Sequence, residues 1–144
     1  MHSSPMLVVE DDDLVRSFLC RALAGVAGEV DGCATGAEAM SAVARRRYGV
    51  ILLDGLLPDI HGIDLGRQVI GHVNGASSGI CLVSGSLRRP TAMHSGVSAL
   101  PKPLRLRELT DAVNQLLDWQ RSADGSTFDR LAMLDLLSAE LLVG

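Results

Sequence analysis

The stretch Val50-Ile51-Leu52-Leu53-Asp54-Gly55-Leu56-Leu57-Pro58 decides the fold of this chain. It opens on an apolar run, which is typical of a parallel strand buried on both faces. Gly55 and Pro58 then mark the turn that follows. Open α/β sheets bind their ligands at the carboxyl ends of central strands, so Asp54 is a candidate for chemistry. The alternative is that Asp54 only caps the turn.

Size and composition restrict the class of protein. The chain has 144 residues, of which 47% are hydrophobic, and this suits one domain with a core. The net charge is −4, and the one basic run, residues 45–47, is expected to end a helix, so direct nucleic-acid binding is disfavoured. No apolar stretch reaches the ~18 residues of a membrane span. Residues 1–5 carry no signal pattern, so we expect a cytoplasmic protein.

The three cysteines do not form a recognisable pattern. Cys20, Cys33 and Cys81 are too scattered for a zinc site, and each has apolar neighbours. We expect them to be buried free thiols in a reducing compartment.

Strands and helices alternate along the chain. The apolar patterns predict strands at 6–9, 30–34, 50–53, 80–83 and 97–100, and helices at 13–24, 36–46, 64–70 and 104–119. This alternation predicts a doubly wound α/β fold: a five-stranded parallel sheet in the order 2-1-3-4-5, covered by helices on both faces. Leu14, Val15, Phe18 and Leu106 are among the apolar residues assigned to the buried helix faces. Pro101 suggests that the fifth strand lies at an edge.

The segment between the last two strands and the end of the chain are unusual. Residues 85–101 are few for a crossover, so the fourth helix is expected to be shortened or irregular. We expect one domain over 1–119, a polar linker over 120–127 and an extra C-terminal helix over 128–144. The apolar stripe of residues 128–142 either packs on this domain or forms a homodimer or partner surface.

Polar residues follow four of the predicted strands. Glu10 and Asp11 follow the first, Asp54 the third, Ser84 the fourth and Lys102 the fifth. In the order 2-1-3-4-5 the ends of these strands are neighbours, so the side chains should share one pocket. Carboxylates this close repel one another unless a divalent cation neutralises them. Hard oxygen ligands in small number suit Mg²⁺.

This pocket suits phosphoryl transfer. Asp54 can act as an aspartate nucleophile toward phosphorus, with the metal and Lys102 offsetting charge on the transferring oxygens. Ser84 can donate its hydroxyl to a phosphoryl oxygen, and Gly85 has no side chain to block the approach.

Four motifs in order carry a family resemblance. They are Leu7-Val8-Val9-Glu10-Asp11-Asp12, the segment from Leu52 to Gly62 that contains Asp54 and Pro58, Val83-Ser84-Gly85, and Leu100-Pro101-Lys102-Pro103. Residues 6 to about 118 thereby resemble the receiver domain of bacterial two-component response regulators, a flavodoxin-like fold.

The resemblance implies roles for the acidic residues. Asp54 would accept a phosphoryl group from the phosphohistidine of a sensor histidine kinase or a histidine phosphotransfer protein. Asp11 and Asp54 would bind Mg²⁺ directly, Glu10 would act through water, and the main-chain carbonyl of Leu56 would be the third protein ligand. Such a protein is not an enzyme in the usual sense, because it only phosphorylates and slowly dephosphorylates itself.

The resemblance also assigns the remaining polar residues and exposes two departures. Ser84 would be the switch hydroxyl and Lys102 the cationic partner, with a cis peptide bond before Pro103. The family usually has Tyr or Phe where this chain has Ala99, so we expect signalling without the aromatic rearrangement. Leu56 replaces a residue that is often polar, so we expect slow loss of phosphate.

We therefore expect a stand-alone receiver that signals to an unidentified output protein through altered protein–protein contacts. One rival is an aspartyl phosphohydrolase, but such enzymes usually carry a second acid where this chain has Leu56. A receiver-like scaffold that is never phosphorylated should lack Asp54, Lys102 or an acidic ligand. A nucleotide-binding domain should have a glycine-rich loop after the first strand.

Overall fold

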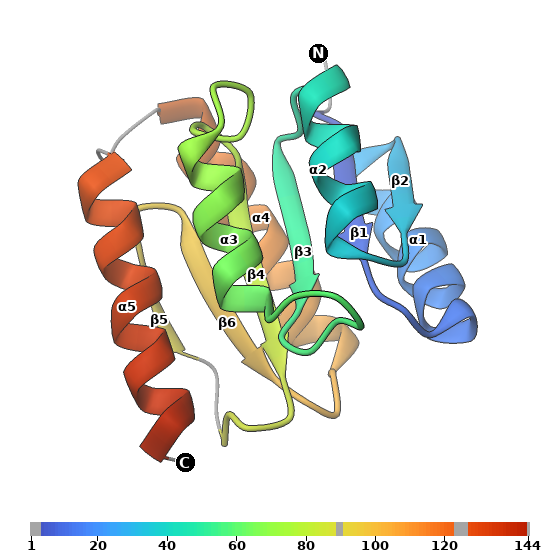
Figure 1. Ribbon diagram of the computed structural model, residues 1–144. Helices are drawn as coiled ribbons and strands as arrows, with labels where there is room; N and C mark the ends of the chain where they lie inside the picture. Colours follow the sequence, from blue (N-terminus) through green and yellow to red (C-terminus); the bar gives the residue numbers. More distant parts are fainter. Residues whose placement is uncertain (1–3, 89–90, 123–126, 144) are drawn as a thin grey trace.

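The computed structural model describes residues 4–88, 91–122 and 127–143, which form one sheet with helices on both faces (Figure 1). The strands are β1 (Met6–Val9), β2 (Val30–Cys33), β3 (Val50–Asp54), β4 (Gly79–Ser84), β5 (Thr91–His94) and β6 (Val97–Pro101). The helices are α1 (Asp13–Ala27), α2 (Gly36–Arg45), α3 (Gly62–Gly71), α4 (Leu106–Ser122) and α5 (Thr127–Val143). None of these helices is long and apolar enough to cross a membrane.

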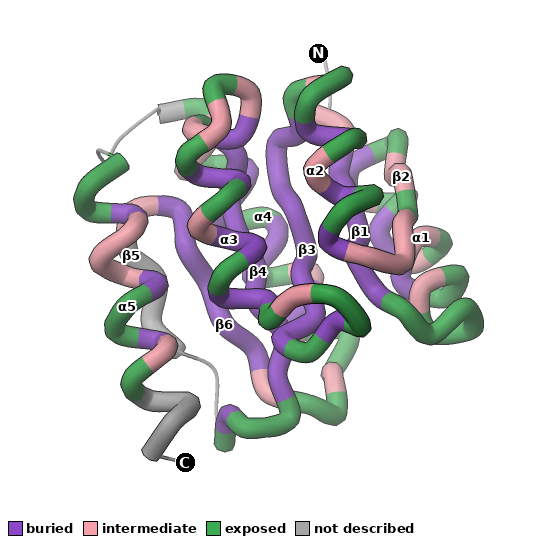
Figure 2. Tube along the Cα trace, viewed as in Figure 1, coloured by how far each residue is buried: buried purple, intermediate pink, exposed green. Residues whose placement is uncertain are grey.

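The sheet has the predicted parallel core. Its strand order is β2-β1-β3-β4-β6-β5, and every pair from β2 to β6 is parallel. The doubly wound α/β fold and the order 2-1-3-4-5 are thus confirmed for the parallel strands. The central strands are buried along their whole length, as Figure 2 shows, because both faces carry helices.

The connection from β4 to β6 differs from the prediction of a short fourth helix. Its described residues, 85–88 and 91–96, contain no helix, and β5 instead pairs antiparallel with β6. Ser95 and Gly96 have φ values of 54° and 71°. These left-handed conformations form the tight two-residue turn of a β-hairpin between β5 and β6. β5 runs back along the outer side of β6, so the chain reaches the start of β6 within the sheet, without a crossover helix among the described residues. The predicted edge position of the 97–100 strand is also wrong, because β5 lies outside β6.

Two apolar clusters fill the two sides of the sheet. α1 and α4 cover one side, and α2, α3 and α5 cover the other (Figure 1). Four apolar side chains predicted to face the core are exposed instead: Leu14 at 84%, Val15 at 40%, Phe18 at 53% and Leu106 at 50%. They lie on α1 or at the start of α4. Cys20 and Cys33 are half-buried and Cys81 is buried, and all three are free thiols.

The C-terminal helix α5 packs on α3 and β6 (Figure 1). Leu134 and Leu137 are 0% and 2% exposed and belong to the cluster on the α2–α3 side. A Cβ atom on Gly66 of α3 would lie 3.2 Å from Leu134 Cδ1, so the glycine lets the two helices approach closely. α5 thus covers the part of the sheet that a crossover helix between β4 and β6 would otherwise cover.

A buried arginine anchors α5. The Arg130 side chain is fully buried, and its Nε donates a hydrogen bond to the Ser95 carbonyl at 2.9 Å. Its other guanidinium nitrogens donate to the carbonyls of Ala76 and Ser78. The guanidinium also lies 4.6 Å from the ring centre of Trp119. Burial lowers the pKa of Arg130 to about 10, so it stays charged at neutral pH and needs these partners.

The position of α5 determines where the folded domain ends. α4 continues to Ser122 and α5 begins at Thr127, so both helices extend into the segment predicted as a linker. We propose that α5 belongs to the folded unit of residues 1–119 rather than to a separate partner surface. The buried contacts of Leu134 and Arg130 support this.

The two sides of α5 give a matched pair of variants. We expect Leu134→Ala to lower the free energy of unfolding by about 2–4 kcal/mol, because it leaves a cavity under the helix. Leu136 is 66% exposed, so Leu136→Ala should change it by less than about 0.5 kcal/mol. Urea unfolding measures both. Equal, small effects, together with a dimeric mass that Leu136→Ala reduces, would contradict a packing role.

Candidate functional site

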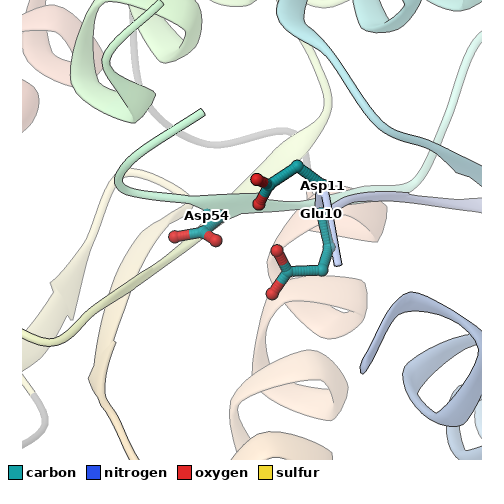
Figure 3. Close-up of side chains that lie close together, drawn as sticks. All are labelled: Glu10, Asp11 and Asp54. Atoms are coloured by element: carbon teal, nitrogen blue, oxygen red, sulfur yellow. The ribbon is translucent and has the colours of Figure 1, made fainter. Parts of the chain in front are cut away.

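Three carboxylates meet at the carboxyl end of the sheet (Figure 3). Glu10 and Asp11 follow β1, and Asp54 is the last residue of β3. The parallel register pairs Val9 with Leu53, so Glu10 and Asp54 come next on their strands at the same level. One oxygen of each carboxylate lies within 4.8 Å of the others, with Glu10 and Asp54 buried and Asp11 exposed.

Lys102 supplies a positive charge beside Asp54. Its Nζ lies 3.1 Å from both carboxylate oxygens of Asp54. β6 brings it there, because Pro101 pairs with Ser84 and the Lys102 amide donates to the Ser84 carbonyl at 3.1 Å. The peptide bond between Lys102 and Pro103 is cis.

Ser84 and Gly85 lie at the end of β4, the strand next to β3. The Ser84 side chain is buried, and its Oγ accepts a hydrogen bond from the Ser86 amide at 3.1 Å. A Cβ on Gly55 would lie 3.3 Å from this Oγ, so the hydroxyl sits against the residue that follows Asp54. A Cβ on Gly85 would meet nothing within 4 Å, so the space beside it is open.

The loop from Gly55 to His61 returns over the site. The Gly62 amide donates to the Gly55 carbonyl at 2.9 Å, and Leu56 pairs with His61 in an antiparallel bridge. A Cβ on Gly62 would lie 2.4 Å from the Asp54 carbonyl oxygen, so a larger residue would push the loop away from Asp54. Leu56 itself is exposed.

Several residues that organise the site carry no strong sequence signal. Asp12 caps α1 by accepting hydrogen bonds from the Leu14 and Val15 amides at 3.0 Å. Arg16 was not predicted to take part. It donates to the Glu10 carbonyl at 2.8 Å, which fixes the start of the acidic loop from α1. A capping pattern could have found Asp12, but nothing local indicates the role of Arg16.

The surroundings of Glu10 in the site shift its pKa. Burial, followed by its hydrogen bond with Asp54, raises the pKa of Glu10 from 4.5 to about 7. A cavity of about 220 Å³ opens beside it, between α1 and the loop after β6. The cavity is lined by Val9, Glu10, Val15, Leu19, Leu52, Asp54, Val83, Lys102, Pro103 and Leu104. Glu10 and Asp54 therefore stand at the polar end of an apolar opening.

The arrangement can hold a divalent cation. It offers three carboxylates within mutual reach, one of them exposed, and this hard oxygen donor set fits Mg²⁺. A cation there would favour the ionised form of Glu10. With Lys102 beside Asp54, the site can also bind an anionic group of several oxygens, such as a phosphoryl group.

Comparisons with known proteins point to one family. Residues 6–114 match the family model described as the response regulator receiver domain. The chain is 29% identical to "Response regulator MprA" of Mycobacterium tuberculosis (strain H37Rv) over 133 residues, which are 91% of this chain and 58% of the relative. The protein of the same name from Mycobacterium leprae matches to the same extent. The chain thus spans less than two thirds of these relatives.

Solved structures agree on the fold. A sensor protein from Polaromonas sp. JS666 is 28% identical with a TM-score of 0.68, covering 81% of this chain and 98% of that one. A CheY-like response regulator receiver domain protein from Methanospirillum hungatei is 22% identical with a TM-score of 0.71, covering 85% and 99%. The receiver domain of the Pseudomonas aeruginosa sensor histidine kinase PA1611, solved with magnesium in its active-site cleft, is 23% identical with a TM-score of 0.67, covering 81% and 98%.

Glu10 should make the metal-free protein sensitive to pH. Because its pKa is raised from 4.5 to about 7 in the fold, its contribution to stability is complete below pH 4.5 and is lost as the pH rises through 7. We expect Glu10→Gln to remove this loss, so that with EDTA the variant exceeds wild type in stability more at pH 8 than at pH 5. Urea unfolding at both values measures it.

The control for this prediction is Asp111→Asn on the exposed side of α4. It should change stability alike at both pH values. A Glu10→Gln variant whose difference from wild type is the same at pH 5 and pH 8 would contradict the raised pKa.

Proposed function

The chain belongs to the response regulator receiver domain family, and on that premise we propose that Asp54 is its phosphoacceptor. The phosphoryl donor is the phosphohistidine of a sensor histidine kinase or a histidine phosphotransfer protein. The observation that carries the proposal is the position of the Asp54 carboxylate, between the acids Glu10 and Asp11 and the Lys102 ammonium group 3.1 Å away.

Mg²⁺ is the proposed cofactor. Asp11 and Asp54 would hold it directly, Glu10 through water, and the Leu56 carbonyl would be the remaining protein ligand. The bound ion would neutralise charge on the phosphoryl oxygens during transfer. The donor set of the site supports this assignment, and magnesium in the cleft of the P. aeruginosa receiver domain is consistent with it.

The residues of the chain have separate tasks in the transfer. One Asp54 carboxylate oxygen forms a bond to phosphorus while the bond from phosphorus to the histidine nitrogen breaks, so the product is an acyl phosphate. Lys102 already donates to both oxygens of Asp54, and it would shift to a phosphoryl oxygen. The Ser84 hydroxyl would donate to another, and the open space beside Gly85 leaves room for that oxygen.

The protein acts on itself rather than on a substrate. We propose Mg²⁺-dependent self-phosphorylation on Asp54 and slow self-dephosphorylation as its chemistry. Leu56 supports this over the phosphohydrolase alternative, because it is apolar at the position two residues after Asp54, where such enzymes usually carry their second acid.

The partners are proteins of a phosphorelay in the cytoplasm. Leu14 and Phe18 on α1 are exposed apolar side chains one helical turn apart, and Val15 between them lines the cavity that leads to Asp54. We propose that this surface docks the phosphodonor. Phosphorylation then changes contacts with an output protein; the other predicted contact, a homodimer through residues 128–142, is disfavoured because Leu134 and Leu137 of that stripe are buried within the chain.

The output step does not use an aromatic switch. Ala99 is fully buried in the cluster that contains Leu134 of α5, and its methyl group cannot follow the Ser84 hydroxyl as a large ring would. The β5 strand also replaces the helix that would adjoin it. We propose that residues 85–99 make no large ordered movement on phosphorylation.

Acetyl phosphate with Mg²⁺ tests the phosphoacceptor. We expect the intact mass of the wild-type chain to rise by one phosphoryl group, and Asp54→Asn to remove the gain, because an amide cannot form the acyl phosphate. Asp64→Asn, on the exposed start of α3, is the control and should be labelled like wild type. A gain that survives Asp54→Asn would refute the assignment.

Leu56 should slow hydrolysis of the acyl phosphate. We expect Leu56→Asn to shorten the half-life of phosphorylated Asp54 by about tenfold, which corresponds to roughly 1.4 kcal/mol in the barrier, because an amide can orient water beside the phosphoryl group. Leu56→Met, which keeps an apolar side chain, should leave it within about twofold. Decay of the wild-type phosphoprotein within seconds would run against this proposal.

A further inference from the structure

The loop that follows Asp54 is fastened to the start of α2. Both carboxylate oxygens of Asp59 accept main-chain hydrogen bonds from the first two residues of that helix: Oδ1 from the Gly36 amide at 2.9 Å and Oδ2 from the Ala37 amide at 3.0 Å. Free amides and the positive end of the helix dipole make this a favourable place for a carboxylate. The two hydrogen bonds also lower the pKa of Asp59.

Packing at the same point is equally close. A Cβ on Gly36 would lie 2.3 Å from Ile60 Cγ2, so any larger residue at this position would force the Ile60 side chain to move. The loop therefore rests against the first residue of α2 as well as bonding to it. Both contacts join residues more than 20 positions apart in sequence, which is why no local pattern predicts them.

The helix also has a local cap, made by residues next to it in sequence. Thr35 Oγ1 accepts a hydrogen bond from the Glu38 amide at 3.1 Å, and Glu38 Oε1 accepts one from the Ala34 amide at 3.0 Å. These bonds form a variant of the capping box, in which Glu38 accepts from the amide one residue before the N-cap. Asp59 therefore adds a second set of hydrogen bonds at the start of α2, and these hold the loop after Asp54 in place.

The loop carries that position to Leu56. Its middle is short and closed: the Leu57 amide donates to the Ile60 carbonyl at 3.3 Å, and Leu56 pairs with His61. Leu57 is buried in the core beneath it. With Asp59 fixed on α2 and Leu57 fixed in the core, the main chain at Leu56 has little freedom left.

We propose that Asp59 is a positioning residue of the phosphoacceptor site, holding the Leu56 carbonyl where the cation binds and coupling the site to α2. This inference rests on the function proposed above. Because coupling is reciprocal, cation binding must also stabilise the start of α2. α2 thus becomes an element that senses the state of Asp54 in a chain with alanine at position 99.

Two cap variants of the same helix separate positioning from simple helix stability. Asp59→Ala removes the anchor of the loop, and Thr35→Ala removes a cap of the same helix without touching the loop. By calorimetric titration with MgCl₂, we expect the dissociation constant to rise three- to tenfold for Asp59→Ala and to stay within twofold for Thr35→Ala. Asp59→Asn, which keeps the shape but loses the charge and one acceptor, replaces Asp59→Ala should that variant not fold.

Hydrogen exchange gives a second readout that does not depend on phosphorylation. In the wild type and in Thr35→Ala, Mg²⁺ should slow exchange of the amides in α2 (Gly36–Arg45). In Asp59→Ala this slowing should disappear.

The results of these experiments distinguish a failure of the positioning role of Asp59 from a failure of the proposed function. Equal losses of Mg²⁺ affinity in the Asp59 and Thr35 variants, or no loss in either, would overturn the positioning role while leaving Asp54 as phosphoacceptor. A wild-type chain that neither binds Mg²⁺ nor takes a phosphoryl group from acetyl phosphate would instead overturn the proposed function, and the inference with it.

Discussion

Repulsion among three carboxylates at one edge of the sheet is the constraint around which this protein is arranged. The register that aligns β1 with β3 and β3 with β4 brings Glu10, Asp11 and Asp54 together. Part of the repulsion is relieved by Lys102, which reaches Asp54 from the end of β6. Burial, followed by the hydrogen bond with Asp54, raises the pKa of Glu10. A site in this condition favours a divalent cation, and the cation together with Lys102 can then balance the negative charge of a phosphoryl group.

The part of the sheet around β6 is covered by the C-terminal helix α5. A parallel sheet must be covered on both faces, yet the chain between β4 and β6 forms a hairpin strand rather than a helix. α5 covers the part of the sheet that a crossover helix would otherwise cover. Leu134 packs against Gly66, and Arg130 donates hydrogen bonds to main-chain carbonyls. In the unfolded chain, water solvates the Arg130 guanidinium about as well as these carbonyls do in the fold. Arg130 therefore fixes the position of α5 more than it adds to the free energy of folding.

The sequence predicted those parts of the molecule that local patterns encode. The apolar run before Asp54 identified a central strand, and the order of strands was enough to bring Glu10, Asp54, Ser84 and Lys102 to one edge. The hairpin was missed because the pairing of β5 with β6 depends on a turn at Ser95. Leu14 and Phe18 were placed in the core because helical spacing does not say which apolar side chains have a neighbour. The anchors made by Asp59 and Arg130 join distant segments, and a single sequence gives no sign of them.

The most direct test of the account is a crystal structure of the protein with Mg²⁺ and beryllofluoride, which mimics a phosphoryl group. The account predicts beryllium bonded to an Asp54 carboxylate oxygen, Mg²⁺ in contact with Asp11 and Asp54, and the Ser84 hydroxyl and Lys102 ammonium group each directed at a fluorine. Beryllofluoride bound at another residue, or a metal ion that does not touch these two aspartates, would contradict it.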